Sequence, residues 1–340
     1  MNKADQYMER DIKNILENGY IDENPRPKYA DGVPAHTYSV NHVCRTYDLS
    51  KGEFPICSLR RIAWKTGIKE IFTIYQRPTN SISEMEKMGV TWWKDWDIGD
   101  GTIGQRYGAT VKRYDLINKL IDDIKKDPYG RRKVVSLWQE NDLRETAGLA
   151  PCAYNTIWNV RGKYLDMVLI QRSGDMLTAS GAGGVNEVQY AALLMMIARY
   201  TGYKPGVFTH FVANEQIYDR HINQAKEMLK RVENLKNSDT QSKPMLKLNP
   251  EKTNFYDAVY SPVILTLNAI VVAVVMLFSA SGNQTVLAFF GMSAGTAVAV
   301  INYISQIFAP VESLGMEIQT IQSAIAGVHR INEFFEMDEL

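Results

Sequence analysis

The chain contains few cysteines. Only three occur among its 340 residues, at Cys44, Cys57 and Cys152, so their number is odd and no two of them form a CxxC pair. This pattern excludes a disulfide framework, offers no metal-ligand spacing and is typical of a reducing compartment. The polar N-terminus also lacks a signal peptide. We therefore expect a cytoplasmic protein without a metal site.

The chain also lacks an excess of charge of either sign. Its 38 lysines and arginines balance its 38 aspartates and glutamates, which argues against a nucleic-acid-binding protein. The balance is uneven along the chain, because residues 258–340 contain one basic and six acidic residues. Residues 1–257 therefore keep a mild basic excess, which suits an enzyme that binds small anions.

Between residues 258 and 311 charged side chains are absent altogether. Two apolar stretches, 263–280 and 286–308, are separated by a polar turn, and each is long enough for a membrane span, which takes about 17–25 residues. The alternative is a pair of helices buried in a soluble domain. After Pro310 apolar residues recur at helical spacing. We expect residues 258–340 to form an all-α tail with two transmembrane helices and an amphipathic helix.

Residues 1–257 form the other predicted domain. Apolar residues at helical spacing predict helices at 5–19, 114–126, 187–201 and 215–235. Runs rich in β-branched and aromatic residues predict strands at 36–43, 134–138, 156–160, 164–170 and 207–212. Because strands and long helices do not alternate regularly, we expect an α+β fold rather than a doubly wound sheet.

The most informative pair of residues in this domain is Cys152 and Arg172. A thiol attacks carbon as the thiolate, and a nearby guanidinium lowers the thiol pKa by stabilising that charged form. Arg172 and the adjacent Ser173 can also bind a phosphate through charge-assisted hydrogen bonds. The alternatives are that Cys152 is a small buried apolar residue and that the Gln-Arg-Ser segment is a solvated strand end. The pattern indicates covalent attack on a small phosphorylated substrate.

Other motifs surround this pair in a specific order. They are WKTGIKE at 64–70, WWKDW at 92–96, GTIGQRYG at 101–108, the tandem Arg131-Arg132, LAPC at 149–152, QRSGD at 171–175, VNEVQY at 185–190 and NEQIYDRH at 214–221. This ordered set resembles the thymidylate synthase family, and the resemblance covers about residues 1–257.

The resemblance implies the fold and the reaction of that family. The fold is a mixed sheet with packed helices, and the reaction is reductive methylation of dUMP to dTMP with 5,10-methylenetetrahydrofolate as co-substrate and no metal. Cys152 would add to C6 of the uracil, Glu70 would carry out proton transfers, and Arg172 and Asp175 would complete the catalytic set. Without the resemblance, Glu70 is better explained as a solvated helix residue paired with Lys69.

The resemblance also implies shared sites in a homodimer. Arg26, Arg172 and Ser173 would bind the phosphate of dUMP, and Arg131 and Arg132 would be donated to the same phosphate by the partner subunit. A tandem arginine is otherwise usually a surface patch. The shared sites make a dimer obligatory for activity.

The remaining roles concern the base, the sugar and the folate. Asn186 would read the uracil edge, because an amide offers both a donor and an acceptor, and this favours dUMP over dCMP. The sugar would be held by Gln216 and Tyr218, and the folate side would include Trp93, Tyr107 and Asp175. The family commonly has histidine at the position of Gln216. The segment 177–184 is also longer and richer in glycine than usual, and its glycines predict a flexible wall or an anion-binding nest.

The tail carries a second resemblance. Residues 258–340 are similar to the last two transmembrane helices of an ABC exporter, but no GxxxxGK[ST] phosphate loop occurs in the chain. The competing function is therefore a non-catalytic chimeric membrane protein or an exporter fragment. The ordered catalytic motifs favour the enzyme, with the tail as its membrane anchor. Because the sequence after Asp257 does not resemble the family's closing C-terminal segment, we expect covalent capture of dUMP with weak dTMP formation.

Overall fold

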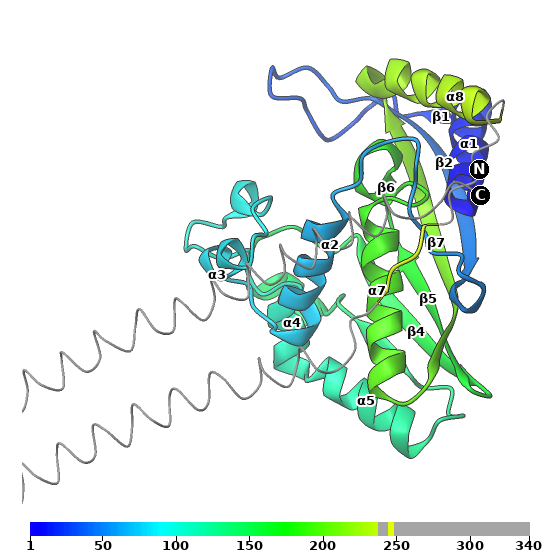
Figure 1. Cartoon of the computed structure of the whole chain (residues 1–340). Coiled ribbons are helices and arrows are strands. Elements are labelled where there is room, and N and C mark those ends of the chain that lie inside the picture. Colours follow the sequence, from blue (N-terminus) through cyan, green and yellow to red (C-terminus); the bar gives the residue numbers. More distant parts are fainter. Residues whose placement is uncertain (237–243, 248–340) are drawn as a thin grey trace, which may run out of the picture. The chain divides into compact units, whose positions relative to one another are not determined.

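The computed structural model describes residues 1–236 and 244–247, and these belong to one compact unit. At its centre is a seven-stranded sheet with the strand order β1-β2-β7-β5-β4-β3, in which β6 pairs with β7 (Figure 1). The strands are β1 (Tyr20–Ile21), β2 (Thr37–Asp48), β3 (Val134–Ser136), β4 (Ala153–Arg161), β5 (Tyr164–Gln171), β6 (Gly174–Asp175) and β7 (Lys204–Tyr218). The α-helices in the described residues are α1 (Lys3–Asn18), α2 (Trp64–Ile71), α3 (Ile82–Lys87), α4 (Gly108–Tyr114), α5 (Leu116–Lys126), α6 (Glu140–Glu145), α7 (Val185–Tyr200) and α8 (Ile222–Lys236).

The strand directions make this a mixed sheet. Strand β2 runs antiparallel to β7, and β3, β4 and β5 form an antiparallel series. Strands β5 and β7 are parallel, so the chain must cross the sheet between them, and α7 makes that crossing. The predicted α+β fold class is therefore confirmed for the described part of the chain.

Helix α7 supplies one wall of the cavity described below. Figure 1 shows it lying across the sheet, where it packs on β5 and β7 and also against α2. Many of its apolar residues are fully buried, among them Val188, Ala191 and Leu194. Gly67 lets α2 approach closely, because a Cβ at that position would come within 2.9 Å of Val185 Cγ1.

Helix α1 shows why some elements are predictable from local sequence. Asn2 and Asp5 form a capping box at its N-terminus, and the helix ends at Gly19. Its apolar stripe packs against β2 and α8. The predicted helix at 5–19 is therefore confirmed by α1, and the predicted helix at 187–201 is confirmed by α7.

Along β2 and β7 the alternation of more buried and less buried residues shifts by one position near the middle of each strand. In β7 the buried positions are Phe208, His210 and Val212, and then Glu215 and Ile217. The alternation shifts opposite His42, which has a left-handed backbone (φ 59°). The side chains of Asn214, Gln216 and Tyr218 consequently line a cavity instead of the core.

The predicted helix at 215–235 is wrong in its first part. Residues 215–218 continue β7, and the helix begins only at Ile222, after a 3-10 turn at 219–221. Glu215 and Ile217 pair with Val40 and Tyr38 of β2. Pairing with a strand distant in the sequence therefore overrides the local helical spacing.

The predicted transmembrane stretches 263–280 and 286–308, and the amphipathic helix after Pro310, lie outside the described residues. Within residues 1–236 and 244–247, no helix combines the length and the apolar character that crossing a membrane requires.

Candidate active site

A cavity of about 1000 Å³ lies where the carboxyl ends of β5 and β7 meet the first turn of α7 and the N-terminal end of β4. Every residue assigned to the site from the sequence lines this cavity except Arg131 and Arg132. The lining residues from that set are Arg26, Glu70, Trp93, Tyr107, Cys152, Arg172, Ser173, Asp175, Asn186, Gln216 and Tyr218. The fold thus brings together motifs that are separated by nearly two hundred positions of sequence.

Cys152 lies immediately before β4 and is half-buried in the cavity wall. The backbone N–H of Arg172 donates to the carbonyl of Cys152 at 2.9 Å. The guanidinium of Arg172 is itself held by the loop before the cysteine, because its Nε donates to Pro151 O at 3.0 Å and its Nη2 to Ala150 O at 2.9 Å. The pairing of Cys152 with Arg172 is therefore built into the backbone.

The effect of this pairing on the thiol differs from the prediction. Burial raises the pKa of Cys152 above its ordinary value, and the charge of Arg172 opposes this shift but is the weaker influence. Burial is the stronger influence because the cavity wall removes water from the sulfur. The direction of the Arg172 effect is as predicted.

Glu70 of α2 is buried and faces the cavity, so the alternative of a solvated residue paired with Lys69 is wrong. Its Oε1 accepts hydrogen bonds from the indole N–H groups of Trp92 at 2.7 Å and Trp93 at 2.5 Å, and its Oε2 accepts from Gln189. Burial raises the pKa of Glu70, and the three hydrogen bonds partly offset that rise. A carboxyl with a raised pKa and several fixed donors is suited to proton transfer near neutral pH.

Asn186, in the first turn of α7, connects to the same carboxylate. Its Nδ2 donates to Gln189 Oε1 at 3.1 Å, and Gln189 then donates to Glu70. Its Oδ1 accepts from the hydroxyl of Ser180 at 3.1 Å. Both ends of the Asn186 amide are therefore engaged by named partners, which sets its orientation.

Four other predicted residues lie close together around β6 and the end of β7. The hydroxyl of Ser173 donates to Gln216 Oε1 at 3.4 Å. Asp175 caps the following turn by accepting from the N–H of Leu177 at 3.0 Å, and burial raises the pKa of its carboxyl. Tyr218 packs edge-to-face on Tyr29.

Aromatic side chains form another part of the cavity wall. Trp92, Trp93, Trp96 and Tyr107 line it, and the rings of Trp93 and Tyr107 lie 5.0 Å apart. Trp96 is 45% exposed and Trp92 37% exposed, so flat apolar surface is available at the cavity. Among the described residues, no group of histidine, cysteine, aspartate and glutamate side chains could hold a metal ion.

Two predicted features differ from the rest of the site: the tandem arginines lie apart from the cavity, and the glycine-rich segment 177–184 is packed against other residues. Arg131 and Arg132 are exposed in the loop before β3 and do not line the cavity of their own chain. The glycine-rich segment is packed: its N–H at Gly183 donates to Glu187 Oε2 at 2.6 Å, and its carbonyl accepts from Cys57 N–H at 3.0 Å. The anion that this turn binds is thus a buried carboxylate of the same chain.

Sequence reasoning missed the roles of Trp92 and Gln189. Both belong to motifs noted in the sequence, but neither was assigned to the site. Gln189 lies three residues after Asn186 on α7, a spacing that places two side chains on the same face of a helix. That spacing is the one feature from which Gln189 could have been found.

Comparisons with known proteins agree with the geometry. The sequence profile of the thymidylate synthase family matches residues 5–267. The chain is 49% identical over 264 residues to a thymidylate synthase of Lactococcus lactis subsp. cremoris, a match that covers 76% of this chain and 91% of the relative. It is 46% identical over 264 residues to one of Streptococcus pneumoniae, with the same coverage. The solved structure of thermostable thymidylate synthase A from Bacillus subtilis is similar at a TM-score of 0.62 and 34% identity, covering 67% of this chain and 84% of that one.

Proposed function

Because the chain belongs to the thymidylate synthase family, we propose that the cavity around Cys152 carries out the reductive methylation of dUMP to dTMP. The observation that supports this best is that Cys152, Glu70 and Asn186 line one cavity. These three side chains provide a nucleophile, a proton-transfer group and a group that reads the base.

The covalent step uses the sulfur of Cys152. The sulfur forms a bond with C6 of the uracil, and the electron pair of the C5–C6 double bond moves to C5, which becomes the carbon nucleophile. After C5 has gained its new substituent, its proton must leave, and release of the product breaks the S–C6 bond. Glu70 lies in the same cavity and is assigned to the proton network, because its raised pKa allows it to hold and release a proton.

Substrate binding is assigned by the chemistry of the lining residues. Arg26, Arg172 and Ser173 would bind the phosphate, with Arg131 and Arg132 supplied by a second copy of the chain. Asn186 would bind the uracil edge, while Gln216 and Tyr218 would bind the sugar. The exposure of both tandem arginines, away from the cavity of their own chain, supports their donation across a dimer interface.

The folate, when bound, supplies the carbon and the hydride that together form the new methyl group. The lining residues fit such a molecule, since Trp92, Trp93 and Trp96 offer flat aromatic surface for its ring system. Asp175 adds a carboxylate that can accept hydrogen bonds from ring N–H groups. The described residues of this chain therefore suit a large heteroaromatic co-substrate beside the nucleotide.

The test is covalent capture at Cys152. The probe is 5-fluoro-dUMP with methylenetetrahydrofolate, because fluorine replaces the C5 hydrogen, the proton loss cannot occur, and the adduct persists. Intact-mass and peptide-level mass spectrometry are expected to locate the nucleotide on Cys152. Cys152→Ser should abolish the adduct, while Cys44→Ser, at an exposed cysteine outside the cavity, should leave it unchanged. A full-length chain that binds dUMP but forms no adduct at Cys152 would contradict the proposal.

We also propose that dTMP formation is slow relative to capture. The support is the sequence after Asp257, which does not resemble the segment that closes over the folate in this family. Water that reaches an open site weakens the interactions that assist the later steps. An assay of dihydrofolate absorbance with dUMP as substrate tests this, and rapid turnover of every captured nucleotide would refute it.

We further propose that residues 258–340 attach the chain to a membrane. The support is the two apolar stretches at 263–280 and 286–308, together with the absence of charged residues from 258 to 311. Cell fractionation of the full chain and of a chain lacking 258–340 is the test. The full chain should sediment with membranes and resist extraction by salt or carbonate, and a full chain found in the soluble fraction would exclude the attachment.

A further inference from the structure

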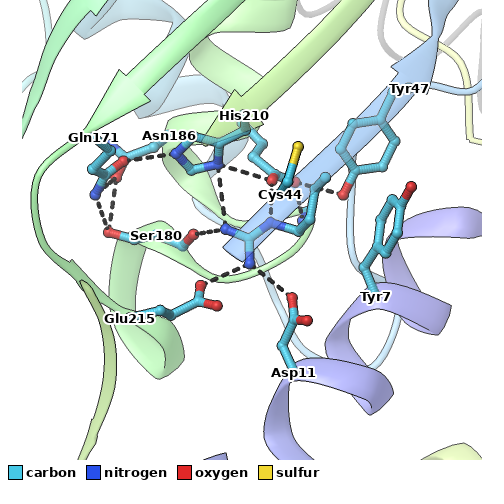
Figure 2. Close-up of polar contacts among 12 residues, drawn as sticks. Tyr7, Asp11, Cys44, Tyr47, Gln171, Ser180, Asn186, His210 and Glu215 are labelled. Atoms are coloured by element: carbon cyan, nitrogen blue, oxygen red, sulfur yellow. Dashed lines mark hydrogen bonds and ion pairs between the residues drawn. The ribbon is translucent and has the colours of Figure 1, made fainter. Parts of the chain in front are cut away.

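A buried cluster of charged residues lies next to Gln171 and Ser180, two residues that line the cavity (Figure 2). It consists of Asp11, Arg45, Glu187, His210 and Glu215, and none of these side chains is more than 3% exposed. Its centre is the guanidinium of Arg45. Because burying charges is costly without exact pairing, this cluster has little freedom to rearrange.

The contacts of Arg45 hold one imidazole in place. Its Nε bonds Glu187 at 2.6 Å, and its Nη1 bonds Asp11 at 2.9 Å and Glu215 at 2.7 Å. Its Nη2 lies 3.3 Å from Nδ1 of His210, whose ring also lies 2.9 Å from Glu187 Oε1. His210 is thus anchored on its Nδ1 side, and its Nε2 points out of the cluster toward Gln171.

The proton on Nε2 of His210 follows from its surroundings. Gln171 directs its Nε2 toward the carbonyl of Ser173 at 3.0 Å, and a carbonyl can only accept. The opposite end of that amide, Oε1, therefore faces His210 Nε2 at 3.0 Å, so the imidazole nitrogen must carry hydrogen. With hydrogen on Nε2, Nδ1 of a neutral ring can only accept from Arg45 Nη2, and it donates to Glu187 only in the charged ring.

From His210 a chain of hydrogen bonds runs in one direction to the catalytic carboxylate. Gln171 Nε2 donates to Ser180 Oγ at 2.6 Å, and Ser180 Oγ donates to Asn186 Oδ1 at 3.1 Å. The bonds from Asn186 to Gln189 and from Gln189 to Glu70 continue in the same sense. We name this series the relay; its members are Arg45, His210, Gln171, Ser180, Asn186, Gln189 and Glu70.

We propose that His210 is a positioning residue that, together with the backbone carbonyls of Ser173 and Gly67, sets the direction of the relay and thereby fixes which end of the Asn186 amide faces the base. Every member that could turn by 180° is constrained by its neighbour, so reversing the Asn186 amide would break the bonds on both sides of it. The charged cluster is the anchor, and its role here is to hold one imidazole N–H in position. This inference rests on the proposed binding of dUMP.

The consequence of the relay is a choice between uracil and cytosine. Uracil presents an N3–H donor beside an O4 acceptor, whereas cytosine presents an N3 acceptor beside an N4 amino donor. An amide free to turn could bind either edge, because turning exchanges its donor and acceptor. An amide held with Oδ1 toward Ser180 and Nδ2 toward Gln189 matches only one of them. The relay therefore makes base preference depend on a residue that touches neither nucleotide.

The experiment compares two substitutions at one position. His210→Leu removes the N–H that bonds Gln171, whereas the amide of His210→Gln reaches about as far and can still donate. Dissociation constants for dUMP and dCMP are measured on the full chain, together with inorganic phosphate, which has no base, and the melting temperature. We expect His210→Leu to lower the preference for dUMP over dCMP at least about tenfold. We expect His210→Gln to retain the preference within about threefold, and phosphate binding to be unchanged in both variants.

Several outcomes would overturn the inference. A folded His210→Leu chain with the original preference would exclude the relay, and an equal loss of preference in both variants would show that ring packing, and not donation, matters. If His210→Leu does not fold, Ser180→Ala decides, because it removes one hydroxyl of the relay and keeps the backbone carbonyl that binds Arg45 at 2.7 Å. An unchanged preference in Ser180→Ala would then overturn the inference. A wild-type chain that binds phosphate but neither nucleotide would overturn the proposed function itself, and the inference with it.

Discussion

At Cys152 two opposing effects act on one sulfur atom. Burial in the cavity wall raises the pKa of the thiol, and the guanidinium of Arg172 lowers it. In the free chain burial is the larger effect, so most of the sulfur is protonated at neutral pH. In the proposed reaction, the thiolate would then form during substrate binding or attack, and a neighbouring group would accept the proton.

Substitution of Arg172 tests this balance. We expect Arg172→Ala to move the pH midpoint of Cys152 alkylation further upward, because the substitution removes a cation that lowers the pKa of the thiol. The measurement is the rate of iodoacetamide labelling between pH 6 and 10, followed at peptide level so that Cys152 is distinguished from Cys44 and Cys57. Lys51→Ala is the control, because Lys51 is exposed and does not line the cavity. A midpoint that stays constant or falls in Arg172→Ala would contradict the assigned electrostatic role.

At the scale of elements, the buried charged cluster ties four of them together. Asp11 comes from α1, Arg45 from β2, Glu187 from α7, and His210 and Glu215 from β7. One buried cation faces three carboxylates, and the pKa values of two of these carboxyl groups shift in opposite directions. The pKa of Glu187 is lowered to about 2, chiefly by the charge of Arg45 acting against burial, whereas burial raises the pKa of Glu215 to about 7.

These opposite shifts predict opposite dependences of stability on pH. Glu187 stabilises the fold above pH 4.5, and that contribution is lost as the pH falls toward 2. Glu215 binds its proton more tightly in the folded chain, so its ionisation costs stability as the pH rises from 4.5 to about 7. We therefore expect the stability gained by Glu215→Gln relative to wild type to be larger at pH 8 than at pH 5, by about 1–3 kcal/mol.

Urea unfolding of both chains at the two pH values measures this difference. Glu17→Gln, at an exposed position of α1, serves as the matched control and should show no such change between pH 5 and pH 8. A Glu215→Gln chain whose stability relative to wild type is the same at both pH values would rule out titration of Glu215 in this range.

At the scale of the whole molecule, the proposed function divides the phosphate site between two chains. Arg131 and Arg132 are exposed and do not line their own cavity, while the proposed function assigns them to the cavity of a second copy. Such sharing makes activity a property of the dimer.

Mixing two defective chains tests the sharing. We expect Arg132→Ala alone to weaken dUMP binding by about 1–3 kcal/mol through the loss of a charge-assisted bond, and Cys152→Ser alone to form no adduct. After the two chains are unfolded and refolded together, each mixed dimer has one complete site. At a 5-fluoro-dUMP concentration too low for capture by Arg132→Ala alone, capture should recover to about a quarter of the wild-type level. Mixed dimers that show no recovery would exclude donation of Arg132 across the interface.

The sequence indicated which residues would gather in one place better than it indicated where strands and helices end. Cys152, Glu70, Arg172 and Asn186, to which the resemblance assigns roles in the reaction, all line one cavity. The capping box and apolar stripe of α1 also made that helix predictable, since both depend on neighbours within one or two turns. The end of β7 was mispredicted as helix because its strand partner lies in β2, far away in sequence.

What the sequence determined by itself was therefore the set of reactive groups, because chemical identity and order are properties of the chain before it folds. What only the tertiary structure decided was the state of those groups. Burial raised the pKa of Cys152 and of Glu70, and the hydrogen bonds from His210 joined residues whose contacts no local spacing reveals. The physical reason is that pKa and hydrogen-bond direction depend on water exclusion and on partners from other elements, and both arise only when those elements pack.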